Sequence, residues 1–177
     1  MASIIKNIKA IIGLGNPGPT YYRTRHSIGY RIIDELAERF GGTWHNRDIL
    51  QTATIAINDQ PVLLIKSNTY MNDSGKAIPF ILKKGIKPEE ILVIHDELEK
   101  PFGTIGFKID GSHRGHNGLR SIIQVCGNAF ARLRIGIGRP EKKEDVPEYV
   151  LKPFTQSETD IQLIIDQAIA EIEKIFQ

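Results

Sequence analysis

Apolar residues alternate along the chain between short continuous runs and stretches with helical spacing. The short runs predict strands over residues 9–15, 49–57, 61–66, 91–95, 104–109 and 131–138. The helical spacing predicts helices over residues 28–40, 74–85, 119–126 and 157–176. Strands that alternate with helices favour an α/β fold, here a single-domain three-layer αβα sandwich over residues 1–177. A turn at 58–60 joins two strands as a hairpin, so the central sheet is expected to be mixed and mostly parallel.

Polar residues near the helix ends sharpen three of these predictions. Ser27 stands before the first helix and is expected to cap it. Ser157 and Asp160 form a capping-box-like start to the last helix. Pro79 lies inside the second helical segment, which predicts either a proline within its first turns or a later start.

Residues 13–18 match G-x-G-x-x-G, the pattern of dinucleotide-binding turns. That use requires a helix that opens at the third glycine and an acidic residue at the end of a second strand. Here Pro17 and Pro19 flank the third glycine, and the acidic residues at the right distance lie inside the 28–40 helix. The segment is therefore interpreted as a tight glycine turn that presents Asn16.

A histidine and an aspartate stand out at the ends of predicted elements. His26 lies at a helix start, where a cationic imidazole is disfavoured, so it is expected to be neutral near pH 7 and able to accept a proton. Asp96 follows the buried run 91–94, at the strand end where functional groups of α/β sheets gather. Its carboxylate can fix the tautomer of an imidazole. The alternatives are a packing histidine and a turn-capping aspartate.

Three asparagines occupy similar places. Asn16 and Asn72 follow predicted strands, and Asn117 precedes a predicted helix. Neutral amides there can bind a carbonyl, stabilise an oxyanion or hold a water. Each asparagine by itself is also a common turn or cap residue.

The chain offers few other routes to chemistry. Cys126 is the single cysteine, which excludes an intrachain disulfide and fits a reducing compartment, and it is expected in the core. No G-x-S-x-G elbow occurs. His113 and His116, with His95 and Asp96 nearby, give only a weak metal signal, so neither metal nor cofactor is predicted. Water activated by a histidine–aspartate pair remains, which indicates direct hydrolysis of an activated acyl group such as an ester.

Charge is unevenly distributed, although the net charge is only +2. Residues 105–143 carry eight basic and two acidic side chains, and residues 144–177 carry two basic and eight acidic ones. A basic stretch beside an acidic tail indicates a polyanionic partner, and a solvated surface is the alternative. With no signal peptide and no apolar span that would cross a bilayer, a cytoplasmic protein is expected.

Five motifs in order resemble the bacterial peptidyl-tRNA hydrolase family: GLGNPG-x-x-Y-x-x-TRH, YMNDSGKA, ILVIHDEL, GHNGLRSI and RLRIGIGRP. The match runs from about residue 11 to 140, and YVL at 149–151 extends it. The resemblance implies a monomeric three-layer α/β enzyme with no obligate protein partner. It would cleave the ester between a peptide, or an N-blocked amino acid, and the 3′ end of tRNA, and so recycle tRNA from aborted translation.

The resemblance also implies roles for individual residues. His26 is similar to the base that activates water, Asp96 to the group that holds that base in its basic form, and Asn16 to the residue that distinguishes blocked from unblocked aminoacyl-tRNA. The positions similar to substrate-binding residues are Tyr21, Tyr70, Asn72 and Asn117. Lys108 and Arg134 match basic positions that grip the tRNA, which agrees with the basic stretch.

The sequence departs from the family pattern at several points. Ser27 replaces an asparagine, and 112–114 replaces part of a glycine-rich run, which brings Arg114 near the expected cleft rim. Residues 100–102 differ from the usual proline-rich run, and the family's C-terminal part is often longer. The rival interpretations are a non-catalytic RNA-binding protein on the same fold and, less favoured, a nicotinamide-dependent enzyme. Retention of the histidine, the aspartate and all three asparagines argues against the first.

Overall fold

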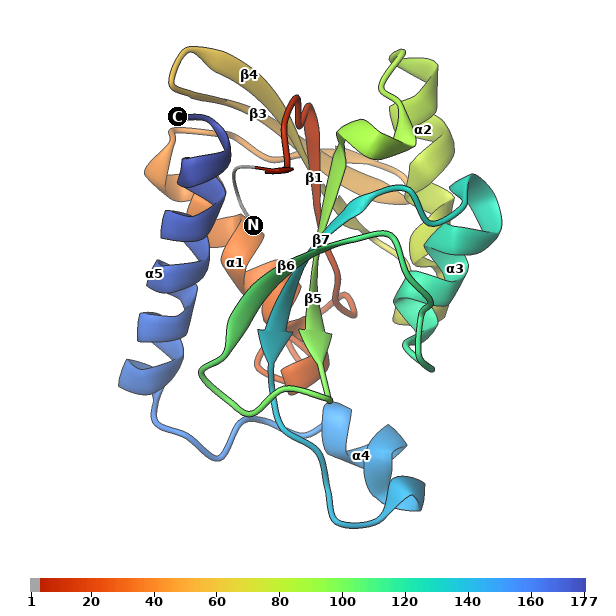
Figure 1. Cartoon of the computed structure of the whole chain (residues 1–177), viewed down its shortest axis with the longest axis vertical. Coiled ribbons are helices and arrows are strands. Elements are labelled where there is room, and N and C mark those ends of the chain that lie inside the picture. Colours follow the sequence, from red (N-terminus) through yellow and green to blue (C-terminus); the bar gives the residue numbers. More distant parts are fainter. Residues whose placement is uncertain (1–3) are drawn as a thin grey trace.

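The apolar runs form one seven-stranded sheet, with the order β2-β3-β4-β1-β5-β7-β6, in a computed structural model that describes residues 4–177 (Figure 1). The strands are β1 (Ala10–Gly13), β2 (His45–Arg47), β3 (Leu50–Ile57), β4 (Gln60–Ser67), β5 (Ile91–Glu97), β6 (Ile105–Ile109) and β7 (Ala131–Gly136). The helices are α1 (Ile28–Arg39), α2 (Ile78–Lys83), α3 (Asn117–Cys126), α4 (Val146–Val150) and α5 (Glu158–Ile175). Short 3₁₀ helices span Arg25–Ser27, Met71–Ala77, Pro88–Glu90 and Lys143–Asp145.

The sheet is mixed, as the hairpin predicts. β4, β1, β5 and β7 are parallel neighbours, whereas β3 pairs antiparallel with β4 and β6 pairs antiparallel with β7. β5 and β7 end side by side and point toward α4 (Figure 1). Polar residues that follow these two strands therefore meet at one edge of the sheet, beside α4.

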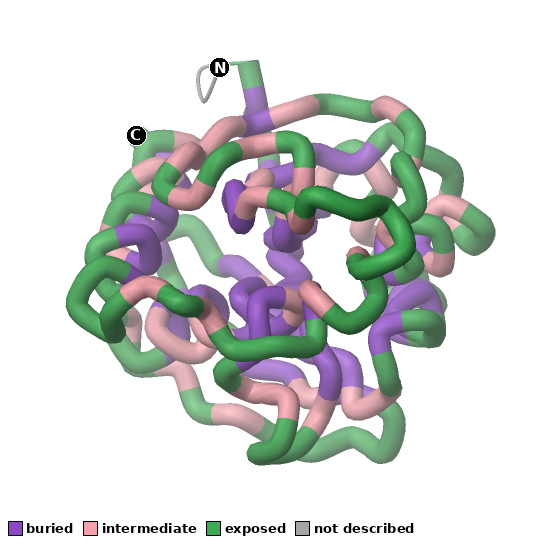
Figure 2. The backbone as a smooth tube through the Cα atoms, turned by 90° about the horizontal axis from the view of Figure 1, so that it is seen from below, coloured by how far each residue is buried: buried purple, intermediate pink, exposed green. Residues whose placement is uncertain are grey.

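The two faces of the sheet bury separate apolar cores. Ile11, Leu92 and Leu133 pack with α1 and α5 on one face. Ile12 and Val93 pack with α2 and α3 on the other. Alternate residues of each strand point to opposite faces, so each central strand contributes to both cores. Figure 2 shows these buried segments at the centre of the molecule, ringed by exposed turns. The three-layer prediction is confirmed.

The glycine turn after β1 permits an unusually close helix–strand contact. A Cβ built on Gly13 would lie 2.4 Å from the carbonyl oxygen of Gly29, and one on Gly29 would lie 2.5 Å from the carbonyl oxygen of Ile94. Gly18 has a φ of +95°, yet α1 begins only at Ile28. The glycines therefore bring α1 against β1 and β5, and no helix opens at the third glycine, as the tight-turn interpretation requires.

One helix prediction is refined and another is confirmed. The 74–85 segment begins as the 3₁₀ helix Met71–Ala77 and becomes α-helical at Ile78, with Pro79 in the first turn, which is the later-start alternative. The Ser157 hydroxyl accepts a hydrogen bond from the Asp160 amide at 3.1 Å and caps α5 as predicted. β2 and α4 were not predicted, because elements of three and five residues carry no measurable period.

Two other expectations are wrong. Ser27 does not cap α1 with its side chain, because its Oγ accepts the backbone N–H of Asn16 at 3.1 Å. Cys126 is not a core residue: it is the last residue of α3, only half-buried, and it packs on the edge of the second core. Within the described residues, no helix is long and apolar enough to span a bilayer.

Candidate active site

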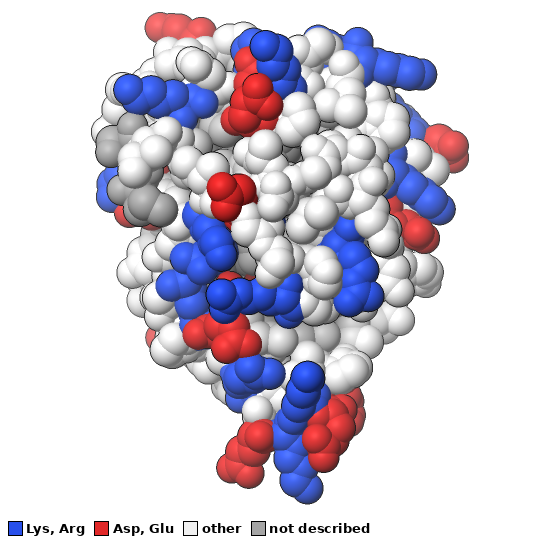
Figure 3. Space-filling view, turned by 45° about the vertical axis from the view of Figure 1, so that its right-hand side comes forward, with Lys and Arg blue, Asp and Glu red and all other residues white. Residues whose placement is uncertain are grey.

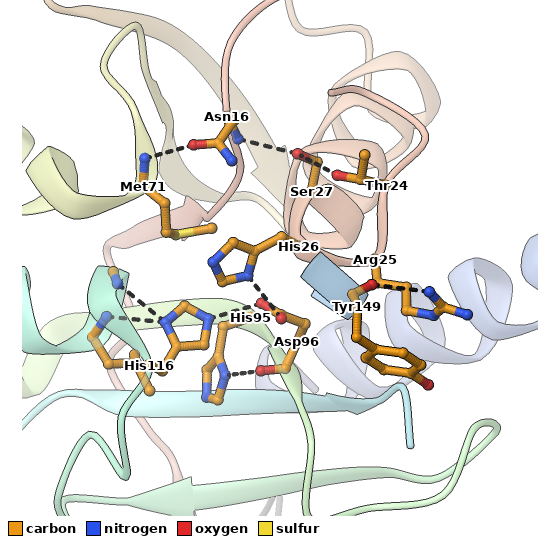
Figure 4. A network of polar contacts seen from close by, with 12 residues as sticks. Asn16, Thr24, Arg25, His26, Ser27, Met71, His95, Asp96, His116 and Tyr149 are labelled. Carbon is orange, nitrogen blue, oxygen red and sulfur yellow. Dashed lines mark hydrogen bonds and ion pairs between the residues drawn. The ribbon is translucent and has the colours of Figure 1, made fainter. Parts of the chain in front are cut away.

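A histidine and an aspartate from different elements meet at the carboxyl end of the parallel strands. Asp96 lies near the end of β5 and is 2% exposed, and His26 lies in the 3₁₀ turn that leads into α1. The Nδ1 of His26 lies 2.8 Å from Oδ2 of Asp96 (Figure 4). A carboxylate only accepts, so Nδ1 carries the proton and donates, and the Nε2 lone pair of His26 is left available.

The protonation of this pair is set by their contact. Burial lowers the pKa of His26, but the charge of Asp96 and its hydrogen bond outweigh burial and raise that pKa above its ordinary value. The direction of this pKa shift runs against the expectation that the helix N-terminus keeps His26 neutral, because a carboxylate in direct contact outweighs the partial charge of a helix end. Burial raises the pKa of Asp96, yet His26 and His116 together hold it well below its usual range, so Asp96 remains ionised.

His116 is a third member of this network that the sequence did not identify as such. Its Nε2 lies 2.7 Å from Oδ1 of Asp96. Its Nδ1 accepts the backbone N–H groups of Gly118 at 3.1 Å and Leu119 at 3.3 Å and so caps α3. Since Nδ1 accepts, the ring proton resides on Nε2 and is donated to Asp96. Histidine is an uncommon helix cap, so local sequence gave no signal for this role.

The same three side chains are the one His, Cys, Asp or Glu cluster within residues 4–177 that has its ligand atoms close together, within 4.8 Å of one another. The nitrogen and oxygen atoms of these side chains are engaged in hydrogen bonds with one another and with the backbone, which suits shared protons better than a metal cation. Each oxygen of Asp96 accepts an N–H, and the second nitrogen of His116 is held by backbone amides. His113 does not join the cluster, because its Nδ1 accepts the N–H of Gly115 at 2.9 Å. The pairing of His113 with His116 considered from sequence is therefore not assembled.

Asn16 is held so that one amide donor remains available. It is 5% exposed, its backbone N–H donates to Ser27 Oγ, and its Oδ1 accepts the N–H of Met71 at 2.7 Å. Because Oδ1 faces that donor, the NH₂ group turns toward the space beside His26 (Figure 4). Asn16 therefore presents a fixed hydrogen-bond donor to whatever occupies that space.

A pocket of about 270 Å³, here called the amide pocket, opens on one side of His26. It gathers the sequence-predicted residues Asn16, Tyr21, His26, Tyr70, Asn72 and Asn117. Pro147, Val150 and Leu151 form its apolar wall. The rings of Tyr21 and Tyr70 meet edge to face, with centroids 6.0 Å apart. The pocket thus combines neutral amides with aromatic and aliphatic surface.

A second pocket of about 320 Å³, here called the basic pocket, adjoins the first at His26. Asp96, His116 and Asn117 line it together with the basic residues Lys108, Arg114, Arg132, Arg134, Arg139 and Lys143. Figure 3 shows lysine and arginine side chains across the middle of this side of the molecule. Both basic residues named from the resemblance, Lys108 and Arg134, lie here, and Arg114 stands at the rim as expected.

Arg132 has a structural role within the basic pocket that the sequence did not predict. Its guanidinium donates to the carbonyl of Ser112 at 2.8 Å and to that of Gly111 at 2.5 Å. Burial lowers the pKa of Arg132. The side chain therefore fixes the loop that replaces the family's glycine-rich run, and Lys108 and Arg134 carry the more accessible charge.

The fold and the site define an α/β protein that carries a histidine–carboxylate network at the carboxyl end of its parallel strands, between an amide-lined and a basic pocket. The family model described as peptidyl-tRNA hydrolase matches residues 10–177. The chain belongs to this family and is a hydrolase that acts on ester bonds.

Individual relatives agree over most of the chain. The peptidyl-tRNA hydrolase of Sulfurihydrogenibium sp. (strain YO3AOP1) is 46% identical over 165 residues, 92% of this chain and 86% of that protein. That of Aquifex aeolicus (strain VF5) is 42% identical over 167 residues, 92% of this chain and 87% of that protein. The crystal structure of the Acinetobacter baumannii enzyme matches with a TM-score of 0.85 at 41% identity and covers 94% of this chain and 85% of that one.

Proposed function

We propose that this enzyme hydrolyses the ester of peptidyl-tRNA through water activated by His26, and so releases free peptide and free tRNA. One observation carries the proposal: His26 stands where the amide pocket and the basic pocket meet. Peptidyl-tRNA has the same two-part character, because a neutral chain of amides is joined by one ester to a polyanion. The scissile ester lies at His26 when each part occupies its matching pocket.

The position of the ring proton of His26 supports general-base catalysis. Asp96 holds the proton of His26 on Nδ1, so Nε2 accepts a proton from water as the oxygen attacks the ester carbonyl. The resulting imidazolium is stabilised by the ionised Asp96. His26 then returns the proton to the departing 3′ oxygen of the tRNA as the tetrahedral intermediate collapses. Water adds across the ester, and no cofactor enters the balance.

Asn16 is proposed to select N-blocked substrates. Its NH₂ is a donor with a fixed direction, so it suits the carbonyl of a peptide or an N-acyl group. A free aminoacyl-tRNA brings an ammonium group, which also donates and cannot pair with that NH₂. Asn72 and Asn117 line the same pocket and are proposed to bind substrate with Tyr21 and Tyr70.

The basic pocket is proposed to hold the acceptor arm of the tRNA. Lys108 and Arg134 supply positive charge there, and contacts to phosphate oxygens give affinity without reading base sequence. This suits an enzyme that acts on many tRNAs. We further propose that the protein recycles tRNA in the cytoplasm as a monomer, without an obligate protein partner.

The direct test is to incubate the protein with N-acetyl-aminoacyl-tRNA, with and without EDTA, and to measure hydrolysis as the release of the acyl group. We expect turnover that EDTA does not change, because the proposed chemistry uses only side chains and water. Folded protein without turnover would exclude the hydrolase mechanism, and loss of turnover in EDTA would indicate a metal.

His26→Ala isolates the proposed base. We expect it to lower kcat by at least about 10²–10⁴-fold, the usual contribution of a positioned acid–base group, while tRNA binding is retained. Filter binding of the uncharged tRNA measures the second quantity. A variant that turned over at the wild-type rate would show that another group is the base.

A further inference from the structure

The segment 146–152, which comprises α4 and the two residues after it, forms a wall of both pockets. Pro147 and Val150 line the amide pocket and the basic pocket, and Leu151 lines the amide pocket. Leu151 is 43% exposed although it is aliphatic, and it faces the space beside His26. An α-helix of five residues is too short to hold this position by its own hydrogen bonds. Contacts to the rest of the molecule must therefore fix the wall.

Those contacts come from the residue directly before His26. Arg25 is 6% exposed, and its Nη1 donates to the carbonyl oxygen of Tyr149 at 2.9 Å. Its guanidinium carbon lies 3.8 Å from the centroid of the Tyr149 ring (Figure 4). Its backbone N–H donates to the carbonyl of Lys152 at 3.1 Å. One residue thus holds the wall segment through side chain, ring stacking and backbone.

The guanidinium of Arg25 is unusual for a buried charge. Within residues 4–177 it forms no ion pair, and its Nε is buried without a hydrogen-bond partner. Buried arginines are normally matched by carboxylates, because desolvating a charge is costly. Here an aromatic face and one carbonyl stand in for the carboxylate. The polar and aromatic contacts of the Arg25 side chain therefore go to Tyr149 of the wall segment.

Tyr149 extends the connection to the sheet. Its hydroxyl donates to the carbonyl of Ile137, just beyond β7, at 2.7 Å. Arg25, Tyr149 and the end of β7 therefore form one chain of contacts, here called the Arg25–Tyr149 latch. The latch joins the turn that carries His26 to the segment that faces it.

We propose that Arg25 and Tyr149 are positioning residues that hold the wall segment 146–152 at a fixed distance from His26. The inference rests on the proposed function and deepens it. The wall supplies the apolar surface on which the side chain of the esterified amino acid packs, at the C-terminal end of the peptide. Such packing is equally present in the bound substrate and in the transition state. The latch should therefore govern KM more than kcat.

Kinetics of Arg25→Met and Tyr149→Leu test the proposal with N-acetyl-leucyl-tRNA as substrate. We expect each to raise KM on the order of tenfold, the scale of a desolvated cation–π contact, and to leave kcat within about twofold. Arg25→Lys keeps the charge but not the planar stack, so it should restore only part of the loss. The double variant should be little worse than either single one, because both remove the same contact.

Arg31→Met is the matched control. Arg31 is also largely buried, but it pairs with Glu158 of α5 and lines neither pocket. We expect this variant to lower the thermal midpoint without changing KM. If Arg31→Met raised KM as much as Arg25→Met, general destabilisation would explain the result and the latch would be refuted.

Hydrogen exchange gives a readout that does not depend on activity. The amides of Leu151 and Lys152 bond to the carbonyls of Glu148 and Tyr149, so they should exchange faster in Arg25→Met, while those of β5 remain protected. If Arg25→Met fails to fold, Tyr149→Leu carries the same comparison. Unchanged exchange in this segment, or a fall in kcat at unchanged KM, would overturn the proposal. Absence of turnover in the wild-type enzyme would instead refute the proposed function and leave the exchange result standing.

Discussion

At the residue scale, the site depends on which ring nitrogen of His26, His116 and His95 carries the proton. Asp96 accepts from His26 and from His116, and both rings are thereby held with a lone pair on the nitrogen remote from the aspartate. The lone pair of His116 accepts backbone amides of α3, whereas that of His26 is available for the proposed chemistry. Two histidines on one carboxylate thus acquire different roles from their surroundings. His95, the neighbour of Asp96, donates to the Asp96 carbonyl, and burial lowers its pKa to about 3. His95 therefore adds no charge.

Asp96→Asn should lower kcat strongly, although the substitution hardly changes the size of the side chain. An amide presents one acceptor and one donor, so it cannot accept from both histidines, and one ring must turn or change tautomer. When His26 is the one that changes, its proton moves to Nε2 and blocks the base. We expect kcat to fall on the order of 10⁴-fold, as for the same substitution in a serine-protease triad. Circular dichroism serves as the control for folding, and a wild-type rate would contradict the role of Asp96.

The pH dependence of kcat/KM follows from the direction of the His26 shift. The proposed base, His26, accepts a proton only when it is unprotonated, so activity should rise with pH through the pKa of His26. Asp96 raises that pKa, so the midpoint should lie above the ordinary value of about 6.5. For folding the sign is opposite: the contribution of protonated His26 to stability is present at low pH and is lost as pH rises through the same pKa. A rate profile over about pH 5–9 gives the midpoint, and a value below the ordinary one would show that burial outweighs Asp96.

At the element scale, the site depends on the close packing of α1 against the strands β1 and β5. His26 lies in the 3₁₀ turn that leads into α1, and the close approach of α1 to β1 and β5 depends on the absence of side chains at Gly13 and Gly29. That approach brings the His26 ring within hydrogen-bond distance of Asp96 on β5. The helical period alone located α1 well, but it said nothing about the separation of the helix from the sheet. The glycine pattern was informative for packing and misleading as a nucleotide motif.

Gly29→Ala should reverse the usual effect of this substitution in a helix. Alanine normally stabilises a helix relative to glycine by about 1 kcal/mol. Here its Cβ would lie 2.5 Å from the Ile94 carbonyl oxygen, so overpacking should destabilise the fold by about 1–3 kcal/mol. Urea unfolding measures the difference. Gly106→Ala is the control, because its Cβ meets nothing closer than 3.8 Å. Equal stability of the two variants would show that α1 has room to move.

At the scale of the whole molecule, the charge asymmetry is partly internal. The acidic C-terminal part contains α5, which packs on the face opposite α2 and α3. Some of its acids form ion pairs: Glu158 pairs with Arg23 and Arg31, and Asp166 pairs with Arg39. The basic stretch instead lines an open pocket beside His26. Basic side chains next to the proposed base are therefore available to a polyanion.

Arg134→Ala should weaken tRNA binding mainly through charge. Arg134 lies 3.8 Å from Glu97, too far for a strong pair, so its charge is available to a phosphate. We expect KM to rise, and the slope of log binding constant against log salt concentration to fall in magnitude by about 1. Arg39→Ala removes the same charge outside both pockets and should leave that slope unchanged. Loss of kcat at saturating substrate with an unchanged slope would assign Arg134 a role in chemistry instead.

The sequence by itself determined the longer strands and helices in their order along the chain and the mixed sheet, because these follow from the local spacing of apolar residues. It also singled out His26 and Asp96 at element ends, while the family resemblance supplied Tyr21, Tyr70 and the basic residues. The tertiary structure alone decided that His116 shares Asp96, that Ser27 bonds to Asn16, and that Arg25 holds Tyr149. The partners in the last contact stand 124 positions apart. Contacts of this kind depend on the direction of a few polar atoms after the elements have packed, and no periodicity along the chain records those directions.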